Sequence, residues 1–297
     1  MDNVEAKADA MLRSPLGCGF LLAAEASGLP PEEIASQLIG LYLSAYASGD
    51  VGVWQPDYQR IRVEILRQGQ RHRDLAISIL EQPAAADWFG PLDPTKQVVV
   101  LRNQQAPSLT SFVAPNSPLS NWERYAEKSK NGIYTSTLVN GVASIFVGLD
   151  LPIGDIGIGH EPPYKCWLLK AEQSVRVFEI DGAQAWHELC VRYPAVGSST
   201  HNTPDFSMDE GRIVPDWGAV ANDWDAVHLS LGGLLTADQV RVQSESGWTY
   251  HWSWDIEQTL WLRWVFSGVE PLPDNEPQAS PLEGLFHPLF VSRAGIY

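Results

Sequence analysis

A chain of 297 residues, 44% of them hydrophobic, is long enough to bury a sizeable core as one large domain or as two of ordinary size. Its 20 basic and 36 acidic residues give a formal net charge of −16, which repels phosphate backbones and argues against nucleic acid as a partner. An acidic surface either steers cationic small molecules and basic proteins toward the chain or serves solubility alone.

Two features of the sequence bear on the surroundings of the protein. The longest apolar run near the N-terminus, LGCGFLLAA at 16–24, is far shorter than the roughly 20 residues of a membrane-spanning helix. We therefore expect neither a signal peptide nor a membrane segment. The three cysteines, Cys18, Cys166 and Cys190, are scattered and odd in number, which disfavours a disulfide framework. This usage suits a reducing compartment, so we expect a cytoplasmic protein.

The first part of the chain carries helical signals and is predicted to form a helical leader or cap domain, 1–92. The segment LPPEEIASQLIGLYLSAYASGD at 29–50 has prolines at its first turn, acidic residues after them and a Gly-Asp stop, as one helix would. PDYQRIRVEILRQG at 56–69 repeats this format, and HRDLAISILEQ follows. The joint WFGPLDPTKQ at 88–97 is short, and we expect Trp88 and Phe89 to pack against the next domain and fix the leader to it.

From this joint onward the pattern changes to short strands and helices, which predicts an α+β domain over 93–267. The β-branched and aromatic content predicts strands at VVVLR, GIYTST, CWLLK, VRVFEI, AVHLS and TLWLRWVF. Helices are expected at GAQAWHELCVRY and DWGAVANDWD. The remaining residues, 268–297, are rich in proline and are predicted to form an irregular C-terminal tail.

Several familiar binding motifs are not met by the sequence. GDIGIGHEPP at 154–163 has the glycines of a dinucleotide-binding turn but runs into two prolines, and no phosphate-loop lysine motif occurs. His187 and Cys190 are three positions apart on a predicted helix, and His160 with Cys166 would have to complete a metal site. Structural zinc sites show tighter paired spacings, so we predict no metal and interpret these residues as packing positions.

Two carboxylates, Asp255 and Glu257, stand just before an apolar stretch in WDIEQTLWLRWVF at 254–266. If the chain is extended there, both side chains leave the same face of the strand, because strand side chains alternate. Such a pair is either a solvated edge or the mouth of a site. Glu257 is the stronger candidate, because an acid beside so apolar a run needs a reason to be there.

Three motifs in one order resemble the ADP-ribosyltransferase superfamily. GIYTSTLVNGVASIF at 132–146 looks like the stretch of toxin-type and poly(ADP-ribose) polymerase-type enzymes in which Gly, an aliphatic residue and Tyr lead into a strand end and then a helix. DIEQTLWLRW at 255–264 resembles the catalytic-glutamate strand of the same superfamily. With Arg102 at the end of the first strand, the order is similar to the Arg-Ser-Glu branch. The resemblance covers about residues 95–267 and implies a split β-sheet domain.

The resemblance leaves the branch of the superfamily open. Tyr134 suits the His-Tyr-Glu branch and Ser136 the Arg-Ser-Glu branch, while the first strand holds no His-Gly-Thr. Asp255 stands where the Arg-modifying toxins carry Glu or Gln, which leaves the acceptor open as well. The chain also resembles actinobacterial proteins that pair a helical leader with G-aromatic-T-S-T and W-D-x-E-x-T-L-W elements, and this resemblance names no substrate.

The resemblance implies an NAD-dependent ADP-ribosyltransferase or NAD glycohydrolase, with NAD as substrate, no metal and an unknown acceptor. Glu257 would stabilise the positive charge that develops on the ribose when nicotinamide leaves. Arg102 would clamp the pyrophosphate. Tyr134 would stack on the nicotinamide, and Ser136 would hold the ribose or the carboxamide. Asp255 would orient the incoming nucleophile.

Thr137 and His228 complete the expected cofactor-binding residues. The expected site residues also have structural interpretations: His228 in AVHLS as a satisfied core histidine, Thr137 as an ordinary strand-end residue, and Arg102 as a surface strand end. Two other function classes stay open. One is a non-catalytic module that holds a nucleotide or another planar ligand in an aromatic-rich cleft, and the other is an enzyme of specialised metabolism that acts on a small molecule or nucleoside.

Overall fold

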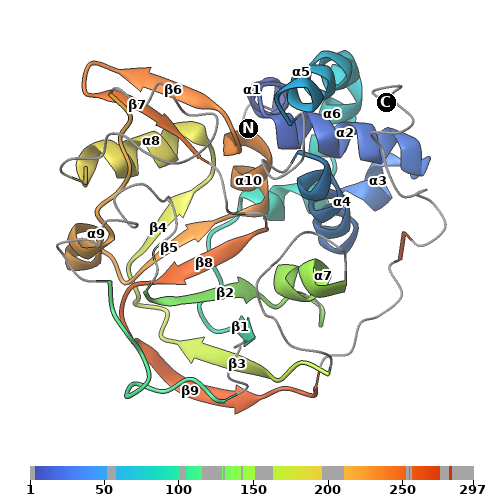
Figure 1. The fold of residues 1–297 in the computed structure, drawn as a ribbon. Helices are drawn as coiled ribbons and strands as arrows, with labels where there is room; N and C mark the ends of the chain where they lie inside the picture. Colours follow the sequence, from blue (N-terminus) through green and yellow to red (C-terminus); the bar gives the residue numbers. More distant parts are fainter. Residues whose placement is uncertain are drawn as a thin grey trace.

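The structure is a computed structural model that describes residues 4–51, 58–100, 105–115, 129, 131–141, 143–150, 163–195, 211–251, 254, 256–274 and 281–282, with the backbone alone at 49–51, 58 and 148–150. Within these residues the chain is mixed α and β. Helices occupy the described chain as far as Phe89, and the first strand begins at Gln97 (Figure 1). The predicted order of a helical region followed by a mixed α and β region is therefore confirmed.

The helical region begins with two helices that the sequence analysis did not assign. Its elements are α1 (Val4–Met11), α2 (Pro15–Ser27), α3 (Pro31–Ile34), α4 (Gln37–Val51), α5 (Tyr58–Gly69), η1 (Gln70–His72), α6 (Arg73–Leu80) and η2 (Pro83–Phe89). Helix α2 holds the apolar run at 16–24; the Ser14 hydroxyl caps its start by accepting from the Gly17 amide at 3.1 Å. It ends at Gly28, whose φ of 67° lies in the left-handed region. In the described part of the chain, no helix is long and apolar enough to cross a bilayer.

The segment 29–50, expected as one helix, forms the two helices α3 and α4. Ser36 separates them: its hydroxyl donates to the Glu33 carbonyl at 2.7 Å and accepts from the Ile39 amide at 3.4 Å. A serine hydroxyl that bonds the nearby backbone offers it an alternative to the helical pattern, so one helix closes and the next opens there. Helix α4 also continues through the expected Gly-Asp stop to Val51.

The strands that follow form one seven-stranded sheet and a separate hairpin. The sheet has the order β4-β5-β8-β2-β1-β3-β9, in which β4 and β5 are parallel and the other neighbours are antiparallel. Its strands are β1 (Gln97–Val100), β2 (Ile133–Thr137), β3 (Cys166–Ala171), β4 (Val177–Ile180), β5 (Ala226–Leu229), β8 (Gln258–Trp261) and β9 (Phe266–Pro271). Each predicted strand segment therefore contributes to the sheet.

TLWLRWVF, predicted as one strand, is divided between two. Strand β8 ends at Trp261, and β9 begins at Phe266 beside β3, at the far edge of the sheet. The break is tertiary in origin, because the carbonyl of Asp225 accepts from the amides of Leu262 and Arg263, at 2.9 and 3.3 Å. Strand β9 also takes in residues 268–271, which the sequence analysis had assigned to the irregular tail.

The remaining elements lie between the strands in the chain. They are α7 (Ser144–Asp150), α8 (Ala183–Arg192), α9 (Trp217–Asp223), α10 (Leu231–Ala237), β6 (Arg241–Ser244) and β7 (Gly247–Tyr250). The helices predicted at 182–193 and 216–225 correspond to α8 and α9. Helix α10 and the β6–β7 hairpin were not predicted; the hairpin lies beside α8 (Figure 1).

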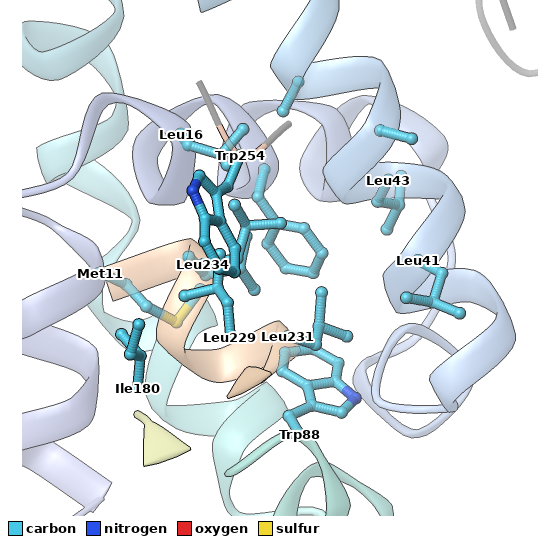
Figure 2. Close-up of a cluster of buried hydrophobic side chains, with 14 of the residues drawn as sticks. Met11, Leu16, Leu41, Leu43, Trp88, Ile180, Leu229, Leu231, Leu234 and Trp254 are labelled. Atoms are coloured by element: carbon cyan, nitrogen blue, oxygen red, sulfur yellow. The ribbon is translucent and has the colours of Figure 1, made fainter. Parts of the chain in front are cut away.

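One hydrophobic core joins the helical region to the sheet. Figure 2 shows Met11, Leu16, Leu41 and Trp88 beside Ile180, Leu229 and Trp254, which all belong to one buried cluster. Trp88 is fully buried against Phe20, with ring centres 5.5 Å apart. Phe89 packs on Gly232 of α10 so closely that a Cβ there would lie 2.4 Å from its ring. Phe89 therefore packs against the mixed α and β region, as predicted, and Trp88 lies in the core that both regions share.

The two faces of the sheet differ in what they pack against. On β2, Tyr134 belongs to the cluster shared with the helical region, whereas Ile133 belongs to a second cluster that includes Val99, Trp167 and Trp261. This alternation follows from the period of two along a strand. The second face also carries a row of buried polar side chains from several strands.

Candidate functional site

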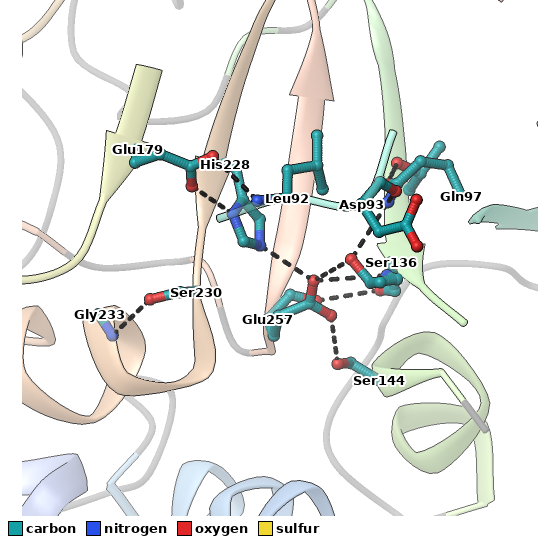
Figure 3. A network of polar contacts seen from close by, with 12 residues as sticks. Leu92, Asp93, Gln97, Ser136, Ser144, Glu179, His228, Ser230, Gly233 and Glu257 are labelled. Atoms are coloured by element: carbon teal, nitrogen blue, oxygen red, sulfur yellow. Dashed lines mark hydrogen bonds and ion pairs between the residues drawn. The ribbon is translucent and has the colours of Figure 1, made fainter. Parts of the chain in front are cut away.

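A buried polar network surrounds Glu257, the residue immediately before β8 (Figure 3). The strand order β5-β8-β2-β1 brings together segments that are far apart in the sequence. Three of the predicted site residues, Glu257, Thr137 and His228, meet here through their side chains. Two others, Arg102 and Asp255, lie outside the described residues.

The carboxylate of Glu257 is held from three directions. The Ser144 hydroxyl of α7 donates to Oε2 at 2.6 Å, and the Thr137 hydroxyl donates to Oε1 at 3.1 Å. The Thr137 amide also points to Oε1, at 3.4 Å, and Nε2 of His228 lies 3.3 Å from the same oxygen. The side chain of Glu257 is only 5% exposed. A buried carboxylate requires such donors, because an unpaired buried charge is costly.

His228 is clamped between two carboxylates. Strands β4 and β5 place Glu179 beside His228 in register, and Nδ1 of His228 lies 2.5 Å from Oε2 of Glu179. The other oxygen of Glu179 accepts from the Leu92 amide at 3.0 Å. Burial opposes the charge on the imidazole, but the hydrogen bonds and charges of Glu179 and Glu257 outweigh it and raise the pKa of His228 to about 9. At neutral pH the ring is therefore protonated, and both N–H groups donate.

A chain of hydrogen bonds ends on Glu257, and every donor in it points toward the Glu257 carboxylate. The indole N–H of Trp261, which can only donate, donates to the Thr135 hydroxyl at 2.8 Å, and that hydroxyl donates to Oε1 of Gln97 at 2.6 Å. Nε2 of Gln97 donates to the Thr137 hydroxyl at 3.1 Å, which leaves the Thr137 proton for Glu257. All of these dipoles point toward the carboxylate, so each bond strengthens the next. Gln97 itself is fully buried.

The network carries an excess of negative charge and one unused polar group. Two carboxylates, Glu179 and Glu257, flank a single imidazolium, so one negative charge remains uncompensated among these three groups. Thr259, opposite His228 in the register of β5 and β8, is fully buried, and its hydroxyl has no hydrogen-bond partner within the described structure. This hydroxyl next to His228 is a buried polar group whose hydrogen-bonding capacity the described side chains leave unused.

Tyr134 and Ser136 lie on the opposite face of β2. The Tyr134 hydroxyl donates to the carbonyl of Ser129 at 3.0 Å, and its ring meets Trp254 edge to face with centres 5.8 Å apart. The Ser136 hydroxyl donates to the main-chain carbonyl of Glu257 at 3.0 Å. The residues expected to bind the cofactor are therefore divided between the two faces, and Ser136 positions the backbone of Glu257.

The cysteines and His187 have local partners or apolar surroundings. The three cysteines are free and buried, and burial raises the pKa of Cys18 to about 12 and that of Cys190 well above its ordinary value. Nδ1 of His187 lies 2.9 Å from the Thr249 hydroxyl. Over the residues that the structure describes, no three His, Cys, Asp or Glu side chains gather as metal ligands would. His160 lies outside those residues.

Five members of the hydrogen-bond network were not singled out from the sequence: Gln97, Thr135, Ser144, Glu179 and Trp261. Glu179 is the acidic residue of VRVFEI, and Gln97 directly precedes VVVLR. A polar residue within or beside a buried apolar strand is the signal by which both stand out. Ser144, in ASIF, has no comparable signal.

Comparison of the chain with protein-family models, with characterised proteins and with solved structures gives no match.

Proposed function

We propose that the protein cleaves the bond between nicotinamide and ribose in NAD, as an ADP-ribosyltransferase or an NAD glycohydrolase, with Glu257 as the catalytic carboxylate. The observation that carries this proposal is the convergence on the Glu257 carboxylate of donors from β2, β5 and α7. A carboxylate that is buried, oriented and fixed in this way is preorganised for a charge that develops beside it.

The chemistry of NAD cleavage explains why such a carboxylate is useful. Departure of nicotinamide leaves positive charge on the ribose ring, and the uncompensated negative charge of the network favours that transition state. The burial of Glu257 strengthens the attraction, because little water screens it. His228 fixes the carboxylate from one side and Thr137 from the other, so that little reorganisation is needed during the reaction.

Ribose would reach Glu257 by taking the place of a protein hydroxyl. The Ser144 hydroxyl donates to Oε2, and a ribose hydroxyl is a donor of the same kind. Ser144 begins α7, so substrate binding in this proposal moves the first turn of that helix away from the carboxylate. The unpaired Thr259 hydroxyl offers a further position for a polar group of the substrate.

The remaining roles follow the resemblance found in the sequence. In this proposal Arg102 clamps the pyrophosphate and Asp255 orients the nucleophile. Tyr134 and Ser136 lie on the opposite face of β2, so neither contacts the nicotinamide, and Ser136 acts by positioning the backbone of Glu257. The acceptor is a cationic small molecule or a basic protein, which the net charge of −16 would attract, or water in the case of a glycohydrolase.

A second candidate function is a non-catalytic module that binds a nucleotide or another planar ligand. The observation that favours it is the side-chain exposure of Glu257, only 5%, together with its fully occupied oxygens. In that case the network is a structural element beneath a binding surface and catalyses no reaction.

Incubation of the protein with NAD separates the two functions. We expect chromatography to show nicotinamide accumulating with time, together with free ADP-ribose for a glycohydrolase or ADP-ribosylated protein for a transferase. Release no faster than in a buffer control, in the presence of a basic protein as acceptor, would contradict the enzymatic proposal. A calorimetric titration with NAD then tests the binding module, since binding without turnover is what that function requires.

A further inference from the structure

A cavity lies between α1, the start of α8 and β6, away from the Glu257 network. It has a volume of about 550 Å³, within the range of sites that hold small molecules. Its wall includes Lys7 of α1, Arg13 in the turn after α1, Arg241 of β6, Phe89 at the joint, and Asp181 before α8. None of these residues belongs to the network around Glu257, so the cavity is a separate feature.

The charge of this cavity is opposite to that of the chain. Three cationic side chains and one carboxylate line it, whereas the whole sequence has 20 basic and 36 acidic residues. Among the described residues, neither Arg13 nor Arg241 forms an ion pair with a carboxylate. These three cations repel one another, Asp181 in the same wall offsets that repulsion only in part, and a bound anion would reduce it further.

Aromatic rings contact two of these cations. The guanidinium of Arg241 lies 4.4 Å from the centre of the Trp248 ring and donates to the side chain of Gln243 at 3.2 Å. The ammonium of Lys7 lies 4.2 Å from the centre of the Phe89 ring. Cation–π contacts orient a charge without neutralising it, so Arg241 keeps its full charge for a ligand. Helix α8 adds to this field, since Gly182 gives its first amides no side-chain cap.

The cavity walls between the cations are apolar, which indicates that the ligand has an apolar part beside its anionic group. Phe89, Val240 and Val242 line the same cavity, and its volume exceeds what a single inorganic anion fills. Arginine guanidinium groups bind phosphate oxygens through paired hydrogen bonds, and two arginines with a lysine match a doubly charged phosphate. We infer that this cavity binds a small phosphate-bearing molecule with a ring or short apolar part.

The test uses phenyl phosphate as the probe and phenol as its neutral match, titrated into the full-length protein by calorimetry. We expect phenyl phosphate to bind and phenol to give no heat of binding under the same conditions. The double variant Arg13→Gln/Arg241→Gln should weaken phenyl phosphate binding by about tenfold or more, since each lost charge-assisted hydrogen bond weakens binding by roughly that factor. Both arginines are exposed, so the variant should fold as the parent does.

Two further variants complete the experiment. Arg71→Gln removes an exposed positive charge from η1, which does not line the cavity, and should leave the affinity unchanged. Ala10→Glu adds a carboxylate to the cavity wall and should abolish binding, which keeps the test decisive if the double variant fails to fold. The inference is wrong if the parent protein does not bind phenyl phosphate at millimolar concentration, or if phenol binds equally well. It is also wrong if the arginine variant and the Ala10 variant both retain the parental affinity for phenyl phosphate. NAD turnover enters none of these measurements, so the inference stands or falls independently of the proposed function.

Discussion

Raising the pH through the titration of His228 should destabilise the fold by a predictable amount. Its folded pKa of about 9 lies above the ordinary value of 6.5, because Glu179 and Glu257 hold the proton on the buried ring against the cost of burial. A group whose pKa is raised by folding contributes stability in full below its unfolded pKa and loses it as the pH rises through the folded pKa. The difference of about 2.5 pH units corresponds to a free energy of unfolding on the order of 3 kcal/mol. This contribution should disappear between pH 6.5 and about pH 9.

Urea unfolding at a series of pH values measures this loss directly. In the His228→Gln variant, which cannot titrate, the fall in stability over the same window should be absent. His72→Gln is the matched control, because His72 is also paired with a carboxylate, Glu25 at 3.3 Å, but lies in the helical region away from the network. If the parent and His228→Gln lose stability in parallel between these pH values, the pairing of His228 with two carboxylates does not contribute as described.

Three other perturbations test the packing and the network. Trp88→Ala should lower the free energy of unfolding by roughly 3–5 kcal/mol in urea titrations, since it empties a fully buried site; a loss below about 1 kcal/mol would contradict that packing. Deletion of residues 1–92 should give insoluble or molten protein, and the full chain should unfold in a single calorimetric transition, because one core joins both regions; a soluble, well-folded fragment would refute this. Ser144→Ala should cost about 1–3 kcal/mol in thermal or urea unfolding, because it removes a donor from a buried carboxylate, and unchanged stability would show that this bond contributes nothing.

The strands were predictable where composition and burial agree locally. CWLLK and AVHLS carry the β-branched and aromatic residues that strands favour, and both segments form strands. The prediction of TLWLRWVF as a single strand was wrong. Both halves have strand composition, and the break between them depends on Asp225, which is distant in the sequence. Local composition contains no information about such a contact.

The candidate site, like the strands, was predictable from the sequence only in part. Glu257 stood out because an acid borders an apolar run, and that signal is local. Its partners come from other elements: Ser144 is 113 positions away in the sequence and His228 is 29 positions away. The strand order places these residues together, and no spacing in the sequence encodes that order. The two faces of β2, which separate Tyr134 from Thr137, follow from strand alternation and were predictable.

The most direct test of the central claim is nicotinamide release by Glu257→Gln, which keeps the shape of the side chain and removes its charge. We expect turnover to fall by about 10²-fold or more, with NAD affinity close to that of the parent, because the carboxylate acts on charge that exists only in the transition state. Glu270→Gln, the same change at an exposed residue of β9 paired with Lys170, should turn over as the parent does. Release by Glu257→Gln at the parental rate, from a folded protein, would contradict the assignment of Glu257 as the catalytic carboxylate.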